Sequence, residues 1–326
     1  MMKVRLSDIV APIVDDLKLF QQEFENALRS EVRLVNTMVR YVLHNRGKHL
    51  RPILTILSAR LCGQANLDSL RAAALIEILH IATLVHDDVV DESDLRRSWP
   101  SLRRVFNNKK AVLIGDYFLA KALSNVIGLR NFRALEVLSS TAERLSSGEI
   151  LQLEKALLGG MTEEVYYQMV RDKTASLFGS ACELGAITAS EDTNKWEALR
   201  QYGENLGIAF QIKDDLFDLV GDKKSVGKPV GIDVKKNVRT LPLIYALKQL
   251  EPGERRQYLR ILKSHARRGS FARLRGAIEE GGGIDYAKER IQHFSDAAIA
   301  SLGLFPDSEY KSALINVVHF NAQRSS

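Results

Sequence analysis

The chain has 326 residues, of which 45% are hydrophobic and 26% charged, so it can bury a substantial core and is neither disordered nor fibrous. Its 46 Lys and Arg residues exceed its 40 Asp and Glu residues, and the formal charge is +6. A mildly basic chain suits a phosphate-rich partner, whether nucleic acid, a membrane surface or a small phosphorylated substrate. With only 7 prolines, long uninterrupted helices are favoured.

Apolar residues recur at spacings of three and four along almost the whole chain, whereas alternating strand patterns are missing. The sequence therefore predicts an all-α protein. No segment has the length and composition of an interdomain linker, so residues 1–326 are expected to form a single helical domain. In chain order, the predicted helices cover about 5–26, 28–45, 49–62, 67–92, 111–127, 131–157, 161–187, 193–220, 238–250, 253–267, 269–280, 284–302 and 307–322.

The cysteine pattern and the lack of a recognisable secretion signal favour an intracellular protein. Cys62 and Cys182 lie far apart in apolar stretches and fit no metal or disulfide pattern, so we expect two buried thiols. The N-terminal residues mix acids with apolar residues, unlike a secretion signal. Since no run of about 18 apolar residues occurs either, we expect a cytoplasmic protein.

The segment 73–92 is almost entirely apolar except for one polar stripe. Its members follow at spacings of three or four and therefore share one helix face: Glu77, His80, Thr83, Asp87 and Asp91. Asp88 lies beside the two aspartates, and such packing of like charges requires cations. A solvent-exposed acidic helix end, or acids paired with Arg96 and Arg97, is the alternative interpretation.

A second apolar helix, 202–222, repeats the pattern. Its stripe contains Gln211, either Asp214 or Asp215, Asp218 and Asp222, and Asp-Asp-x-x-Asp recurs. If the two helices face a common cavity, their carboxylates converge there. Carboxylate oxygens suit Mg²⁺, which usually completes its coordination with water and substrate phosphate. The sequence thus predicts a Mg²⁺ site that holds a diphosphate or triphosphate.

Cationic segments accompany the acidic stripes, and phosphate oxygens need such donors. The segment 221–240 holds five lysines, one arginine and three glycines, and it is expected to act as a lid over phosphate, with an ordinary solvated loop as the alternative. The other cations are Lys48 and Arg51 within 47–52, Arg96 and Arg97 after the first stripe, and Lys173 beside Thr174.

Two histidines belong to the first acidic segment. His80 lies on the stripe, so it is either a core histidine or a site residue. His86 lies off the stripe, and we expect it to have a structural role behind the aspartates.

In combination, these motifs make the chain resemble the all-trans polyprenyl diphosphate synthases, from about Gly47 to Pro242. The matching segments are the aspartate-rich motifs 86–91 (continuing to 94–97) and 210–218, Gly-Lys-x-x-Arg-Pro at 47–52, Gly-Glu-x-x-Gln-Leu at 148–153 and Lys-Thr at 173–174. The resemblance implies a single bundle of long helices around a deep central cavity, a homodimer, and three Mg²⁺ ions with substrate bound.

The resemblance also implies roles for individual residues. The catalytic set is Asp87, Asp88, Asp91, Asp214, Asp215, Asp218 and Lys173. Asp87, Asp91 and Asp214 would hold Mg²⁺ directly, with the other three aspartates close by. The allylic diphosphate would be bound by Arg96, Lys173, Thr174, Gln211 and Lys228. Isopentenyl diphosphate would be bound by Lys48, Arg51, His80 and Arg97.

Two positions depart from the family pattern. Ser98, followed by Trp99, stands where the family usually has Gly. Asn237 and Val238 stand where Gly-Lys usually precedes the Thr-Leu-Pro at 240–242, which puts one diphosphate contact in doubt. Its possible replacements are Lys235, Lys236 and Arg239.

The implied reaction is repeated prenyl transfer. Mg²⁺ draws charge onto the leaving diphosphate, the allylic C–O bond ionises, the double bond of isopentenyl diphosphate attacks, and a proton is lost to the released diphosphate. Apolar walls exclude water. Ala82 and Thr83, one turn before Asp87, are small and would leave the cavity open. We therefore expect a product longer than farnesyl diphosphate, such as an isoprenoid quinone side chain.

Other functions stay open at this stage. They are a shorter-chain farnesyl or geranylgeranyl diphosphate synthase, a phosphohydrolase of the HD type built on His86-Asp87, a terpene cyclase, and an inactive subunit of a two-chain synthase. The segregation of acidic and basic segments leaves no need for a nucleic-acid partner, and we expect at most a peripheral contact with membranes.

Overall fold

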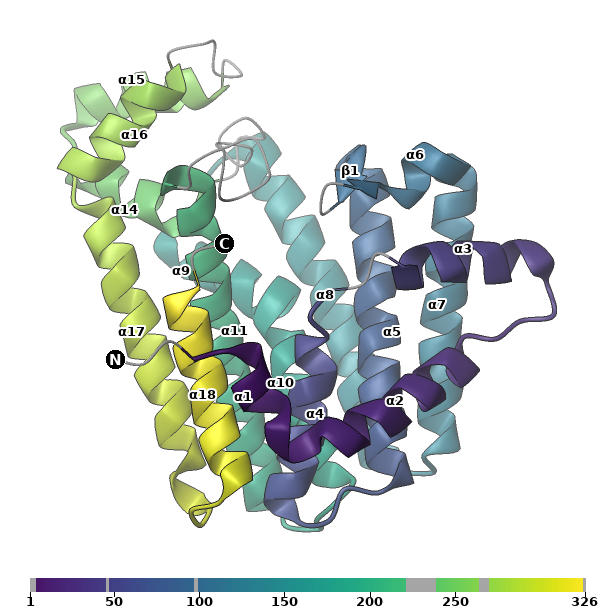
Figure 1. Ribbon diagram of the computed structural model, residues 1–326. Coiled ribbons are helices and arrows are strands. Elements are labelled where there is room, and N and C mark those ends of the chain that lie inside the picture. The colour runs from purple at the N-terminus through teal and green to yellow at the C-terminus, as the bar shows by residue number, and fades with distance from the viewer. Residues whose placement is uncertain (1–3, 45–46, 97–98, 221–238, 264–269, 325–326) are drawn as a thin grey trace.

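The computed structural model describes residues 4–44, 47–96, 99–220, 239–263 and 270–324. These residues form a bundle of helices with one short hairpin at its end (Figure 1), which confirms the all-α prediction. The helices are α1 (Leu6–Val10), α2 (Val14–Ala27), α3 (Arg33–His44), α4 (Leu50–Cys62), α5 (Leu67–Val90), α6 (Leu102–Phe106), α7 (Asn108–Gly128), α8 (Phe132–Leu158), α9 (Glu163–Val170), α10 (Ser176–Ile187), α11 (Thr193–Val220), α14 (Leu241–Gln249), α15 (Pro252–Lys263), α16 (Ser270–Glu280), α17 (Gly283–Ser301) and α18 (Glu309–Gln323). Shorter turns are the 3-10 helices η1 (Ala11–Ile13) and η3 (Leu302–Leu304) and the π-helical turn η2 (Arg171–Ala175).

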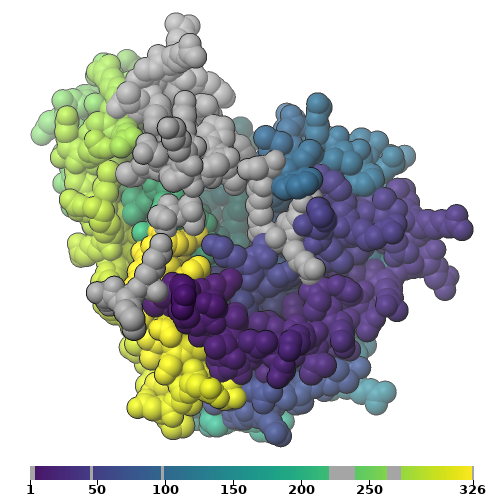
Figure 2. All heavy atoms as spheres, in the orientation of Figure 1, coloured from purple at the N-terminus to yellow at the C-terminus, as the bar shows by residue number. Residues whose placement is uncertain are grey.

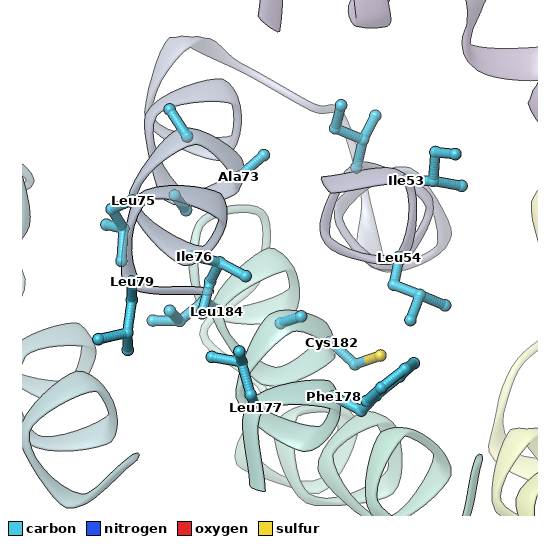
Figure 3. Close-up of a cluster of buried hydrophobic side chains, with 14 of the residues drawn as sticks. Ile53, Leu54, Ala73, Leu75, Ile76, Leu79, Leu177, Phe178, Cys182 and Leu184 are labelled. Atoms are coloured by element: carbon cyan, nitrogen blue, oxygen red, sulfur yellow. The ribbon is translucent and has the colours of Figure 1, made fainter. Parts of the chain in front are cut away.

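Helix α10 lies at the centre of the bundle. All of its residues are buried, and it packs against α4, α5, α8 and α11. Figure 3 shows part of the resulting core, to which Leu54 of α4, Ile76 of α5 and Phe178 of α10 contribute. Helix α11 approaches α10 so closely that a Cβ on Gly203 would lie 2.4 Å from the carbonyl oxygen of Phe178. This packing fixes where α5 and α11 stand relative to each other.

The N-terminal part of the chain differs from the prediction. One helix was expected over 5–26, but the chain forms α1, η1 and α2, because Pro12 has no N–H to donate and starts a new turn. The helix expected over 28–45 is shorter and begins at Arg33.

The segment after the first acidic stripe also differs. The sequence showed no strand pattern, yet β1 (Leu95–Arg96) and β2 (Trp99–Pro100) pair antiparallel. The short helix α6 after them was not predicted either. With two residues per strand, there is no alternation to detect.

Most of the remaining boundaries agree with the prediction to within a few residues. Helix α14 starts at Leu241, later than predicted, with Thr240 as its N-cap and Pro242 in its first turn. Helix α15 is described as far as Lys263, and the rest of the predicted 253–267 helix lies outside the described residues. Both cysteines are free and buried, as expected.

Within the described residues, α7 is the one helix long and apolar enough to cross a membrane by composition. It nevertheless turns one side toward the bundle, where Ala111, Ile114, Phe118, Ala122 and Val126 are buried, and it packs against α5. A helix that packs against the core of a bundle can have the same length and apolar composition.

Candidate active site

The first acidic cluster lies at the C-terminal end of α5. Asp87 and Asp88 fall in the last turn, Asp91 caps the helix, and this turn contains no basic residue. A helix C-terminus carries partial negative charge and disfavours acids. Three carboxylates at this place therefore require cations from elsewhere in the protein or from a ligand.

The second acidic cluster has the same placement on α11. Asp214, Asp215 and Asp218 precede its last residue, Val220, and the last turn again contains no basic residue. Both helices end at the same end of the bundle (Figure 1). At this end, α6 stands on one side of the surface and the green to yellow-green C-terminal helices on the other (Figure 2). The two acidic clusters thus lie at the same end of the bundle, and their convergence on one metal-binding cavity stays a prediction.

Asp88 is held by Arg96 of the hairpin. The guanidinium donates Nε to both carboxylate oxygens, at 3.0 and 2.8 Å, and Nη2 to Oδ1 at 2.8 Å. Asp88 is 4% exposed, so its carboxylate is shielded from water, while the Arg96 side chain stays 35% exposed. The pairing expected under the alternative interpretation is therefore real, but it engages Asp88 and not Asp87.

Asp87 stands in a different environment. Its pKa is raised to about 6, mainly by burial; the charge of Lys173 opposes this rise, the carboxylates of Glu149 and Asp91 add to it, and Arg96 opposes it as well. A desolvated carboxylate with acidic neighbours attracts cations.

Lys173 reaches this place from the π-helical turn η2. Its Nζ forms an ion pair with Glu149 and donates to Oε1 of Gln152 at 3.1 Å. The turn interrupts the helix predicted over 161–187, and π-helical turns frequently occur at functional sites. Glu149 and Gln152 are not among the predicted site residues. Their position in the Gly-Glu-x-x-Gln-Leu motif is the sequence signal that could have identified them.

A chain of hydrogen bonds links η2 to the second acidic cluster. Thr174 Oγ1 donates to Gln211 Oε1 at 2.9 Å, and Gln211 Nε2 donates to Asp215 Oδ1 at 2.8 Å. The other oxygen of Asp215 accepts a hydrogen bond from the buried Tyr166 hydroxyl at 2.6 Å. Tyr166 was not predicted, because a tyrosine in an apolar helix normally indicates only core packing.

A second group of cations lines a cavity of about 680 Å³ beside α4, α5, α10, α11 and α18. Arg51 Nη1 lies 3.1 Å from His80 Nε2, and its guanidinium lies 4.5 Å from the centre of the Phe178 ring. Lys48 Nζ lies 5.3 Å from the Phe320 ring centre. The structure therefore brings Lys48, Arg51 and His80 together, and His80 faces a cavity rather than the core.

Other predicted residues are placed as follows. His86 Nε2 lies 3.2 Å from Asp116 Oδ1 and the imidazole packs on Gly115, so His86 contacts α7, and its structural role stays a prediction. Ala82 is buried, whereas Thr83 is half-buried and donates its hydroxyl to the His80 carbonyl at 2.8 Å.

Several predicted positions lie outside the described residues. They are Arg97, Ser98, Lys228, Lys235, Lys236, Asn237 and Val238, with most of the predicted lid. Arg239, the described candidate for the missing lysine, is half-buried, and burial lowers the pKa of its guanidinium. Its role stays a prediction.

The acidic side chains do not form a complete metal cage. Among the described residues, no three His, Cys, Asp or Glu side chains lie close enough together to hold a metal ion. The convergence of carboxylates expected from the sequence is thus looser than a single ligand cluster. One further residue is present that the sequence did not suggest: Arg324, after α18, forms an ion pair with Asp214.

Comparison with known proteins agrees with this geometry. The family model for Polyprenyl synthetase matches residues 32–278. The all-trans-nonaprenyl-diphosphate synthase (geranyl-diphosphate specific) of Rhodobacter capsulatus is 36% identical over 318 residues, which cover 97% of each chain. The octaprenyl diphosphate synthase of Escherichia coli (strain K12) is 35% identical over 297 residues, which cover 91% of this chain and 92% of that protein.

A solved structure is also similar to this chain in fold and sequence. The polyprenyl synthase from Caulobacter crescentus CB15, crystallised with calcium and isoprenyl diphosphate, has a TM-score of 0.93 and 32% identity, and the match covers 100% of both chains. The resemblance found in the motifs is therefore confirmed. With its two acidic helix ends, its cationic cavity and these relatives, the chain belongs to the polyprenyl synthetase family and is a trans-prenyltransferase that makes a polyprenyl diphosphate.

Proposed function

We propose that this protein is a Mg²⁺-dependent synthase that condenses isopentenyl diphosphate repeatedly with an allylic diphosphate and releases a long-chain trans-polyprenyl diphosphate. The observation that carries the proposal is the link between the two acidic helix ends through η2: the charge of Lys173 acts on Asp87 of α5, and the neighbouring Thr174 is hydrogen-bonded through Gln211 to Asp215 of α11. Acids of this kind bind metal ions, and the adjacent cations bind phosphate.

The donor set fits Mg²⁺. All six aspartates supply hard oxygen ligands, and Asp87 is desolvated among other acids. An incomplete protein cage is what Mg²⁺ prefers, because it keeps several waters and takes other ligands from substrate phosphates. Asp87, Asp91 and Asp214 would hold the ions, with Asp88, Asp215 and Asp218 beside them. When bound, Mg²⁺ supplies Lewis-acid stabilisation of the leaving diphosphate.

The residues of the chain divide between two substrates. Arg96, Lys173, Thr174 and Gln211 would donate to the allylic diphosphate and orient its C–O bond. Lys48, Arg51 and His80 would hold the diphosphate of isopentenyl diphosphate in the neighbouring cavity. The family resemblance adds Arg97 and Lys228 to these sets.

The reaction then follows from this placement. The allylic C–O bond breaks, and the electron pair leaves with the diphosphate. The double bond of isopentenyl diphosphate attacks the cation and forms the new C–C bond. The proton lost from the adjacent carbon passes to the released diphosphate, and the surrounding apolar helices exclude water that would quench the cation.

A long product is supported by two observations. The two relatives described above are named nonaprenyl and octaprenyl diphosphate synthases. In this chain, Ala82 and Thr83 are small side chains one turn before Asp87, where an aromatic residue would close the path of the growing chain. A shorter product is the alternative, and use of the product for a quinone side chain stays a prediction.

We further propose that two copies associate through α7 and α8. These neighbouring helices expose large apolar side chains that a monomer would leave in water, including Ile127 at 66%, Phe132 at 83% and Leu157 at 80%. Phe132→Glu should shift the sedimentation coefficient from dimer to monomer, while Leu304→Glu, at an exposed apolar residue of η3 outside α7 and α8, should leave the dimer intact. A monomeric parent chain would contradict this part of the proposal.

The function is tested by incubating the protein with Mg²⁺, farnesyl diphosphate and labelled isopentenyl diphosphate, followed by sizing of the product. We expect a ladder that ends in a long polyprenyl diphosphate and loss of turnover in Asp214→Ala. Phosphate release without isopentenyl diphosphate would support the phosphohydrolase instead. Full turnover in Asp214→Ala would revive the inactive-subunit alternative.

A further inference from the structure

Arg324 closes the second acidic cluster from the C-terminal end of the chain. Its Nη2 lies 2.5 Å from Asp214 Oδ1 and donates to the carbonyl oxygen of Phe210 at 3.1 Å. The guanidinium lies 4.0 Å from the Phe210 ring centre and 5.3 Å from that of Phe217. Helix α11 therefore holds this one side chain by an ion pair, a carbonyl and two aromatic faces.

The guanidinium is deeply placed for a residue so near a chain end. Its side chain is 13% exposed, whereas that of Asp214 is 41% exposed. Its Nε is buried and has no hydrogen-bond partner among the described residues. Removing a charge from water with incomplete hydrogen bonding is costly, so the contact with Asp214 is the main electrostatic compensation that the described residues provide.

Lys213, which precedes Asp214 on α11, also binds the C-terminal segment that carries Arg324. Its Nζ donates to the carbonyl oxygen of Ala322 at 3.2 Å. Burial lowers the pKa of Lys213, and the positive charges of Arg324 and Lys288 lower it further. The C-terminal segment is thus fixed to α11 at two successive positions, 213 and 214.

From these contacts we propose that Arg324 is the internal counter-cation of Asp214, and that it competes with divalent ions for this carboxylate. The inference rests on the proposed function, in which Asp214 is a metal ligand. The guanidinium occupies Oδ1, and a divalent ion on the same carboxylate would repel it at close range. Ion binding at Asp214 therefore displaces Arg324 and releases the last turn of the chain from α11.

The competition is measured with Mn²⁺ as the probe, by electron paramagnetic resonance of the substrate-free full-length protein. Arg324→Gln should tighten Mn²⁺ binding by roughly tenfold, equivalent to about 1.4 kcal/mol, and Arg324→Lys should keep much of the weaker parental affinity. Lys311→Gln is the matched control, because it removes a charge and an ion pair from α18 at Asp307, away from the site.

A double-mutant cycle separates competition from a general charge effect. In an Asp214→Asn background, Arg324→Gln should leave Mn²⁺ affinity unchanged. The same tightening with and without Asp214, or no tightening in the single variant, would overturn the inference. If no chain bound Mn²⁺ at all, even with inorganic diphosphate, the metal site of the proposed function would fail as well, so the two failures are distinguishable.

A measurement on the parental protein keeps the inference testable if the variants do not fold. The amide of Arg324 donates to the Phe320 carbonyl at 3.0 Å. Hydrogen exchange of the C-terminal peptide should therefore become faster when saturating Mg²⁺ is added without substrate. Unchanged or slower exchange at the C-terminus, with Mg²⁺ bound, would contradict displacement of Arg324.

Discussion

The Cβ atom that Gly148 lacks would lie 2.6 Å from the backbone nitrogen of Lys173. Helix α8 thus touches the π-helical turn η2 backbone to backbone, and this contact sets the distance at which Glu149 meets the Lys173 ammonium. Only glycine allows this approach, because the clash would be with main chain rather than with a flexible side chain.

Gly148→Ala should therefore displace η2 and move Lys173 and Thr174 out of line with the metal site. We expect kcat/KM to fall by about 10²-fold, since a misplacement of about 1 Å costs that much in a positioned active site. Gly276→Ala in α16 is the matched control, because a Cβ there meets nothing within 4 Å. A fully active Gly148→Ala enzyme with unchanged circular dichroism would contradict the role given to this contact.

Tyr166 offers a second test, because the fold contains a matched tyrosine. Tyr166 donates to Asp215 at 2.6 Å, and the equally buried Tyr202 donates to the Leu314 carbonyl at 2.8 Å. Each Tyr→Phe change should cost roughly 1 kcal/mol in the free energy of unfolding. Only Tyr166→Phe should also lower kcat, by about tenfold, and raise the Mg²⁺ concentration required, as steady-state kinetics would show. Equal activities in the two variants would argue against a role for Asp215.

The raised pKa of Asp87 predicts a pH dependence of stability in the metal-free protein. The folded state holds this proton up to about pH 6, whereas the unfolded chain releases it near the ordinary pKa of an aspartate, 3.8. The stability from proton binding is fully present below about pH 4 and is lost as the pH rises through 6. A shift of about two pKa units corresponds to roughly 3 kcal/mol.

Asp87→Asn should consequently stabilise the metal-free protein at neutral pH by up to about 3 kcal/mol and have little effect near pH 4. Urea unfolding across this pH range is the measurement, and Asp285→Asn, which changes an exposed acid paired with Lys288, is the control. The same variant should lose Mg²⁺-dependent activity. A stability gain that does not vary with pH would be inconsistent with the raised pKa.

Product length is tested at Thr83. This side chain is half-buried, so Thr83→Phe should fit into the path of the growing product and shorten it, as chromatography of the dephosphorylated product would reveal. Ala82→Phe should also shorten the product, but Ala82 is 2% exposed, so overpacking should cost about 1–3 kcal/mol of stability. Thr83→Val keeps the size and should keep the length. Unchanged products in both Phe variants would refute this assignment.

Local sequence features predicted most of the helices, because apolar periodicity reports directly which face of a helix is buried. They failed where a local exception decides the outcome. Pro12 divides the first helix, and Leu95 and Arg96 pair in a hairpin too short to show alternation. The π-helical turn at Lys173 has one residue more than an α-helical turn. The apolar spacing does not reveal it, because the extra residue is accommodated where the turn packs against Gly148.

For the site, the sequence by itself determined the chemistry: two acidic clusters at the ends of apolar helices, and the cations that accompany them. Charged residues on an otherwise apolar helix are stable only where they are paired or bind a ligand. The tertiary structure alone decided the partners. Arg96 donates to Asp88, and Tyr166 donates to Asp215. Arg324, 110 residues further along the chain, donates to Asp214. Such pairings depend on how helices pack around α10, and spacing along one helix carries no information about that.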